Sequence, residues 1–261
     1  MIENHSVNIK NLDINYICEG TGEEKIILLH GWGANITLFN SMIEVISKKY
    51  TVYAMDMPGF GKSEEPKEPW TVDDYVDFVI EFAEHFGIKK TMFLGHSFGG
   101  RVIIKLVNRK NLPFEIGNLI LVDIAGIKPK KTFKQKVKLR IYKISKAFLS
   151  IGIVQKFFPE ALENLRKKNG SADYLNATPI MRQTLVKVVN EDLTDLIPNI
   201  TQNTLLIWGK NDTATPIEDG RLMNKLIKNS GIVELDAGHY SFIDQMYTFN
   251  RVIASFLKID L

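Results

Sequence analysis

Hydrophobic residues in this chain occur mainly in short continuous runs, and segments with helical periodicity separate these runs. Runs of this length with almost no polar residues are typical of strands covered on both faces of a parallel sheet. The runs are Lys25–Leu29, Thr51–Met55, Thr91–Leu94, Asn118–Val122, Thr204–Trp208 and Gly231–Leu235. Before them, Ser6–Cys18 alternates apolar and polar residues, which predicts two antiparallel strands that turn at Lys10 and Asn11.

The segments between these runs have the period of amphipathic helices. Thr71–Phe86 is the clearest, because its apolar residues fall on one stripe and Thr71 and Asp74 have the spacing of a capping box. Ile217–Lys228 and Ser241–Leu257 are similar. Strands that alternate with helices predict an α/β fold with a doubly wound, mostly parallel sheet, here of eight strands.

This alternation stops between residues 127 and 190, where the pattern is helical and contains no convincing strand. Lys134–Leu149 carries apolar residues among many lysines, and Gly152, Pro159, Gly170 and Pro179 interrupt the stretch. We therefore expect a core domain made of residues 1–126 and 191–261, with a helical cap inserted at 127–190.

Composition narrows the class of protein. The chain has 261 residues, of which 45% are hydrophobic and 24% charged, as in ordinary globular domains. Cys18 is the single cysteine, so the chain has no internal disulfide, and its sequence contains no Cys/His cluster typical of a metal site. The N-terminal residues lack the pattern of a signal peptide, and no apolar run is long enough to span a membrane. We therefore expect a cytoplasmic protein.

Charge is distributed unevenly along the chain. Residues 127–190 have a net charge of +12 and the remainder −9, although the whole chain is only +3, which does not by itself indicate nucleic-acid binding. Lys128–Lys156 contains ten Lys or Arg and no Asp or Glu. Two interpretations remain open: a solvated amphipathic face, or a docking surface for an acidic carrier protein, an anionic surface or an anionic substrate.

Gly95–Gly100, with the sequence GHSFGG, carries the strongest chemical signal. It lies between a predicted strand and a helical segment that begins near Arg101, which is the setting of a nucleophile elbow. Such a sharp turn strains the central residue and leaves no room for a Cβ two residues before or after it, hence Gly95 and Gly99. We therefore predict that Ser97 is an exposed nucleophile.

A serine hydroxyl needs a general base and a third group that orients the base. His239 follows the last predicted strand and Asp212 follows the strand before it. Functional groups of open α/β sheets gather at the carboxyl ends of strands, so we expect Ser97, Asp212 and His239 to meet there. Asp123 also follows a strand and competes for the acid role, although it could instead tether loops. For His96, beside the serine, we expect a supporting role.

Hydrolysis through a serine also needs hydrogen-bond donors for the developing oxyanion, and backbone N–H groups suit this because they are fixed before the charge appears. The N–H of Phe98, at the start of a helix, is one candidate. The other is the N–H of Trp32, in the His30–Gly33 loop after the first parallel strand. His30 itself could hold this loop by hydrogen bonds.

Together these motifs resemble the α/β-hydrolase-fold superfamily over nearly the whole chain. HGWG at 30–33 is similar to its oxyanion loop, DMPGFGKS at 56–63 to its D-x-P-G-x-G-x-S loop, and Gly95–Gly100 to its elbow. Asp212 and His239 match the positions of its acid and base. By this resemblance residues 127–190 correspond to the helical cap that covers the site and shapes the substrate pocket.

The resemblance implies a serine hydrolase that acts on a small-molecule substrate without metal or organic cofactor. Serine at position 97 argues against dehalogenases and epoxide hydrolases, which have aspartate there. A carboxylesterase for small or medium acyl groups is the leading expectation. The alternatives are a carrier-protein methyl esterase, a carbon–carbon bond hydrolase, a cofactor-free haloperoxidase or perhydrolase, an interfacial lipase and a non-catalytic small-ligand receptor.

Overall fold

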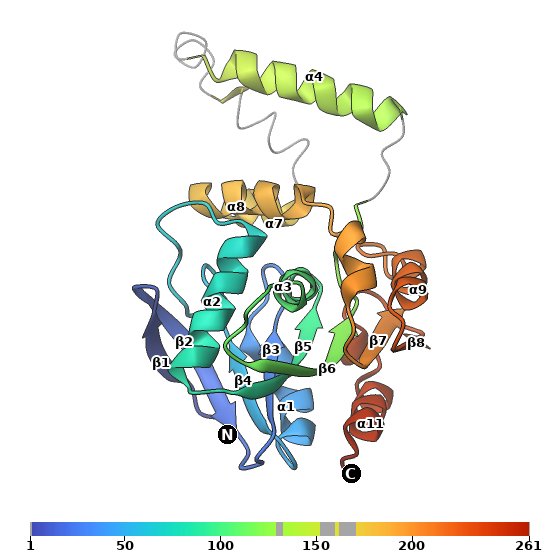
Figure 1. Cartoon of the computed structure of the whole chain (residues 1–261). Helices are drawn as coiled ribbons and strands as arrows, with labels where there is room; N and C mark the ends of the chain where they lie inside the picture. Colours follow the sequence, from blue (N-terminus) through green and yellow to red (C-terminus); the bar gives the residue numbers. More distant parts are fainter. Residues whose placement is uncertain (1, 129–132, 152–159, 162–170, 261) are drawn as a thin grey trace.

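Eight strands form one sheet in the computed structural model, which describes residues 2–128, 133–151, 160–161 and 171–260 (Figure 1). The strand order is β1-β2-β4-β3-β5-β6-β7-β8; β2 pairs antiparallel with β1 and β4, and the other pairs are parallel. The strands are β1 His5–Ile9, β2 Leu12–Glu19, β3 Lys25–Leu29, β4 Thr51–Met55, β5 Lys90–His96, β6 Glu115–Val122, β7 Thr204–Gly209 and β8 Ser230–Leu235. The predicted eight-stranded, mostly parallel sheet is confirmed.

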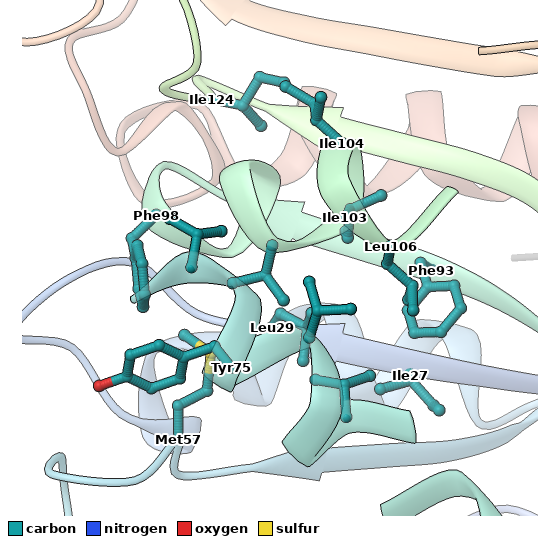
Figure 2. Packing of buried hydrophobic residues seen from close by; sticks show 14 of the residues in the cluster. Ile27, Leu29, Met57, Tyr75, Phe93, Phe98, Ile103, Ile104, Leu106 and Ile124 are labelled. Atoms are coloured by element: carbon teal, nitrogen blue, oxygen red, sulfur yellow. The ribbon is translucent and has the colours of Figure 1, made fainter. Parts of the chain in front are cut away.

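Continuous apolar runs form the central strands because both faces of the sheet are covered by helices. In β3, Ile27 and Leu29 belong to one core cluster, whereas Ile26 and Leu28 belong to the other. Figure 2 shows part of the first cluster, where Tyr75 and Phe98 pack among aliphatic side chains. The covering helices are α2 (Val72–His85), α3 (Phe98–Val107) and α9 (Ile217–Leu226) on the first face, and α1 (Asn40–Ile46) and α11 (Met246–Leu257) on the second.

Local sequence signals explain how α2 begins. Thr71 is its N-cap: the Thr71 Oγ1 accepts the Asp74 N–H at 3.3 Å, and an Asp74 carboxylate oxygen accepts the Thr71 N–H at 2.6 Å. The predicted capping box is therefore confirmed. The predicted continuous helix Ser241–Leu257 is wrong. Gln245 has non-helical backbone angles and separates α10 (Ser241–Asp244) from α11, while the Asp244 carboxylate accepts the Gly238 N–H at 2.8 Å.

The chain between β6 and β7 contains the helices α4 (Phe133–Leu149), α7 (Ala172–Asn176) and α8 (Pro179–Asn190) and a short 3-10 helix, Thr194–Asn199. Helix α8 packs against the core through buried residues such as Met181 and Val188. Helix α4 lies farther from the sheet than α7 and α8 do (Figure 1). The predicted breaks at Gly152, Pro159 and Gly170 lie outside the described residues. Within the described ranges, no helix is both long and apolar enough to cross a membrane.

Candidate active site

The turn between β5 and α3 has the strained geometry expected of an elbow. Ser97 has φ +49° and ψ −108°, a conformation that non-glycine residues rarely adopt. A Cβ on Gly95 would lie 2.9 Å from the backbone carbonyl carbon of Gly99, and a Cβ on Gly99 would lie 2.1 Å from the Leu29 carbonyl oxygen. Both positions therefore require glycine, as predicted, and Ser97 is held at the first turn of α3.

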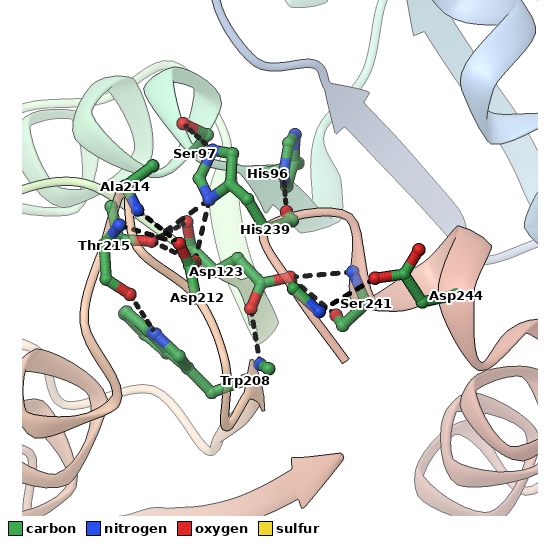
Figure 3. Close-up of polar contacts among 12 residues, drawn as sticks. His96, Ser97, Asp123, Trp208, Asp212, Ala214, Thr215, His239, Ser241 and Asp244 are labelled. Carbon is green, nitrogen blue, oxygen red and sulfur yellow. Dashed lines mark hydrogen bonds and ion pairs between the residues drawn. The ribbon is translucent and has the colours of Figure 1, made fainter. Parts of the chain in front are cut away.

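Three side chains that are distant in sequence meet at the carboxyl edge of the sheet (Figure 3). The Ser97 Oγ lies 3.0 Å from the His239 Nε2, and the His239 Nδ1 lies 2.8 Å from the Asp212 Oδ2. With the ring neutral, the Nδ1–H donates to the carboxylate and leaves the Nε2 lone pair to accept the serine proton. This arrangement can turn the hydroxyl into a nucleophile.

Asp212 is buried at the end of β7 and accepts four hydrogen bonds. Besides His239, the donors are the Ala214 N–H (2.7 Å), the Thr215 N–H (2.9 Å) and the Thr215 hydroxyl (2.6 Å). Burial works to raise the pKa of Asp212, but the hydrogen bonds from His239 and Thr215 outweigh it, so this pKa lies below its ordinary value. The Asp212 carboxylate is therefore negatively charged at neutral pH and can stabilise a positive charge on the His239 ring.

Asp123, the competing acid, lies at the end of β6 and makes no hydrogen bond to the histidine. Its carboxylate accepts the Gly209 N–H (2.7 Å) and both the N–H (3.2 Å) and hydroxyl (2.6 Å) of Ser241. Burial raises the pKa of Asp123 to about 6, although these hydrogen bonds oppose the shift. Asp123 thus ties the end of β7 to the segment that follows His239.

His96 contacts the backbone of His239. The hydrogen bond between its Nε2 and the His239 carbonyl oxygen is 2.8 Å long, so the Nε2 carries the proton, and its ring lies 4.9 Å from that of His239. Burial, and then the nearby His239, lower the pKa of His96 to about 3, so its ring is neutral. His96 therefore fixes the backbone of the general-base candidate without adding charge.

The His30–Gly33 loop lies directly against the elbow. A Cβ on Gly31 would lie 2.7 Å from the His96 Nδ1 and 3.2 Å from the Ser97 Cβ, and the Trp32 and Phe98 rings are 5.5 Å apart. His30 holds this loop: its Nδ1–H donates to the Gly31 carbonyl oxygen at 2.7 Å, and its Nε2 accepts the Met57 N–H at 2.9 Å. The loop that carries the Trp32 N–H is thereby fixed beside Ser97.

The D-x-P-G-x-G-x-S loop supports this arrangement through Asp56 and contributes no group to the Ser97–His239–Asp212 chain. The buried Asp56 carboxylate accepts hydrogen bonds from the N–H groups of Ile36 and Lys62 and from the Asn15 side chain, each 2.8 Å long. The Ser63 hydroxyl donates to the Asp56 carbonyl oxygen at 2.5 Å. These bonds connect the 56–63 loop to strand β2 and to the 3-10 helix that begins at Ile36.

Two residues of this network, Thr215 and Ser241, were not predicted from the sequence. Thr215 follows Asp212 by three positions, which is the spacing at which an aspartate accepts hydrogen bonds from its own turn, and this signal could have identified it. Ser241 has no comparable signal, because its partner Asp123 is far away in sequence. Among the described residues, no group of three or more His, Cys, Asp or Glu is placed to hold a metal ion.

Known proteins with related sequences and structures share this fold. The family model of the alpha/beta hydrolase fold matches residues 25–245. The chain is 30% identical to abhydrolase domain-containing protein abhd-5.2 of Caenorhabditis elegans, over 73% of this chain but only 43% of that protein. It is 24% identical to 2-hydroxy-6-oxononadienedioate/2-hydroxy-6-oxononatrienedioate hydrolase 1 of Pseudomonas putida, over 95% of this chain and 92% of that protein.

A pimeloyl-acyl-carrier protein methyl ester esterase of Pectobacterium atrosepticum is 25% identical over 92% of this chain and 96% of its own length. Among solved structures, the enol-lactonase of Burkholderia xenovorans has the same fold, with a TM-score of 0.74 and 23% identity over 97% of this chain and all of that one. The sheet order, the elbow and the family match lead to one conclusion: the chain belongs to the α/β-hydrolase-fold family and is a hydrolase of that fold.

Proposed function

We propose that this chain is a serine hydrolase that cleaves carboxylic esters of small or medium acyl groups through an acyl-enzyme on Ser97. The observation that carries the proposal is the hydrogen-bonded chain from Ser97 through His239 to Asp212, with links of 3.0 and 2.8 Å. A hydroxyl in this setting can lose its proton to the imidazole as it attacks a carbonyl carbon.

In the proposed first half-reaction, the His239 Nε2 takes the Ser97 proton while the Oγ forms a bond to the ester carbonyl carbon. The carbon–oxygen bond to the alcohol then breaks, and the alcohol leaves with the proton that His239 holds. In the second half-reaction His239 takes a proton from water, the hydroxide attacks the acyl-enzyme, and the Ser97 Oγ leaves with that proton. Asp212 stabilises the imidazolium in both halves.

The negative charge on the carbonyl oxygen needs fixed donors, and we assign this role to the backbone N–H groups of Trp32 and Phe98. The close contact of Gly31 with Ser97 and the start of α3 at Phe98 support this assignment. These donors are held by the fold before the charge develops, which is what makes an oxyanion hole effective. The proposed chemistry needs no metal or cofactor at any step.

We assign the shaping of the acyl pocket to the inserted helical segment, 127–190, acting as a cap over the core formed by 1–126 and 191–261. Helix α8 approaches the site from this segment: Met181 lies against Gly59, and Thr184 accepts the Trp70 N–H at 3.0 Å. Gly33, in the proposed oxyanion loop, lies near the Asp173 carboxylate of α7. Substitutions on α7 and α8 should therefore change the preference for acyl length.

The direct test measures hydrolysis of p-nitrophenyl esters of increasing chain length by the wild type, Ser97→Ala and Ser6→Ala. Ser6 is an exposed residue of β1, far from the site in the fold, and serves as the matched control. We expect Ser97→Ala to lower kcat/KM at least about 10⁴-fold and Ser6→Ala to leave it unchanged. Wild-type rates in Ser97→Ala would refute the proposal.

One alternative has a specific observation in its favour. The relative from Pseudomonas putida is named as a hydrolase of 2-hydroxy-6-oxo dienedioates, so a carbon–carbon bond hydrolase with the same three side chains is the second candidate. Such an enzyme would consume a 2-hydroxy-6-oxo-dienoate faster than any p-nitrophenyl ester. Tight binding of a small ligand with no turnover of either substrate class would instead favour a receptor.

A further inference from the structure

The helix α4 carries an unusual combination of charge and apolar surface. Its sequence, Phe133–Leu149, contains five lysines and one arginine and no acidic residue. Four of its apolar residues recur at intervals of three and four positions and therefore share one face of the helix. They are Val137, Ile141, Ile144 and Phe148.

This stripe is open to solvent in the structure. Its four side chains are between 42% and 62% exposed, and Ile151, just after the helix, is 51% exposed. The corresponding stripe of α2, which includes Val72, Val76 and Val79, is completely buried against the sheet. An apolar stripe left open on a basic helix is typical of helices that lie in a membrane interface.

The position of α4 in the fold leaves the stripe accessible to a large partner. Figure 1 shows α7 and α8 between α4 and the sheet, so α4 forms an outer layer of the molecule. At 17 residues, the helix is about 25 Å long. A surface that contacts it along this length would lie on the side of the carboxyl edge, where Ser97 is.

We propose that α4 docks the protein on an anionic phospholipid bilayer, with its apolar stripe among the acyl chains and its basic residues near the headgroups. A bilayer satisfies both properties of the helix, because lipid phosphates attract Lys and Arg while the hydrocarbon takes up the apolar side chains. An acidic carrier protein would match the charge but would leave most of the apolar stripe against a polar surface.

The test is sedimentation of the full chain with vesicles of phosphatidylcholine alone and of phosphatidylcholine mixed with phosphatidylglycerol. We expect binding to the mixed vesicles, weakened by salt, and little binding to phosphatidylcholine alone. The variant Ile141→Ser/Ile144→Ser/Phe148→Ser should bind the mixed vesicles at least about tenfold more weakly. The matched control is Val186→Ser/Val189→Ser, which changes two exposed apolar residues of α8 and should bind like the wild type.

Folding and catalysis can be tested independently of vesicle binding. The substituted α4 residues are exposed, so the variant should unfold at the same temperature as the wild type, and Ser97→Ala should bind vesicles normally. The docking proposal would be overturned if the triple variant bound mixed vesicles as tightly as the wild type. It would also be overturned if the wild type ignored the vesicles but bound acyl carrier protein through α4.

Discussion

The ends of β6 and β7 each present a buried aspartate, and the two carboxylates have different surroundings. Asp212, after β7, contacts the His239 imidazole and has a lowered pKa. Asp123, after β6, receives only neutral donors from Gly209 and Ser241, and burial raises its pKa to about 6. Burial acts on both in the same direction, so the groups that face each carboxylate decide the outcome.

This difference separates the carboxylate that we propose to act in catalysis from a carboxylate that holds two backbone segments together. The Asp212 carboxylate is oriented by three donors from its own turn and directs its Oδ2 at a titratable ring. The carboxylate of Asp123 connects two backbone segments through Gly209 and Ser241. The comparison would be wrong if substitution of Asp123 abolished activity while substitution of Asp212 changed only the stability of the fold.

The largest expected effect is on catalysis by Asp212→Asn. An amide cannot stabilise the imidazolium and favours the wrong tautomer of His239, so we expect kcat/KM for p-nitrophenyl butyrate to fall about 10⁴-fold. Asp236→Asn, which alters an exposed aspartate after β8, is the control and should retain wild-type activity. Near-normal turnover in Asp212→Asn together with a comparable loss in Asp123→Asn would assign the acid role to β6.

The second-largest expected effect is a pH-dependent difference in stability between the wild type and Asp123→Asn. The folded pKa of about 6 lies above the ordinary value of 3.8, so the stabilisation of the wild type by Asp123 is complete below pH 3.8 and is lost as the pH rises through 6. The difference in unfolding free energy, wild type minus Asp123→Asn, should therefore decrease by on the order of a few kcal/mol across this window. Urea titrations at several pH values measure it, and a constant difference would contradict the assignment.

A smaller effect is expected from Thr215→Val, which removes the hydroxyl that donates to the Asp212 Oδ2 at 2.6 Å. We expect kcat to fall by about tenfold, the amount associated with one hydrogen bond to a charged group. Because that bond helps lower the pKa of Asp212, its loss should raise this pKa, which NMR titration of the Asp212 carboxyl group would detect. A reduced rate with an unchanged Asp212 pKa would indicate a purely structural role for Thr215.

The sheet and the elbow could be predicted from the sequence because their signals are local. Strands buried on both faces are continuously apolar, as in Lys25–Leu29, and a turn as tight as Gly95–Gly99 tolerates few residues at its glycine positions. The α1 helix Asn40–Ile46 was not predicted, because it is short and follows a 3-10 turn. The break at Gln245 was missed because the apolar period continues across it.

The choice between Asp123 and Asp212 could not be made from local pattern alone. Both follow apolar strands, and only the three-dimensional path of the loops decides which carboxylate faces His239. The partners of Asp123 and His96 are likewise distant in sequence. Long-range hydrogen bonds of this kind leave no periodic trace in a single chain.

The most direct test of the central claim, an activated Ser97, is covalent labelling by an organophosphorus fluoride read by intact-protein mass spectrometry. The wild type should gain a single phosphoryl adduct, located by peptide mapping at Ser97, and His239→Ala should react far more slowly. Equal labelling of Ser97→Ala, or an adduct on another residue, would contradict the claim.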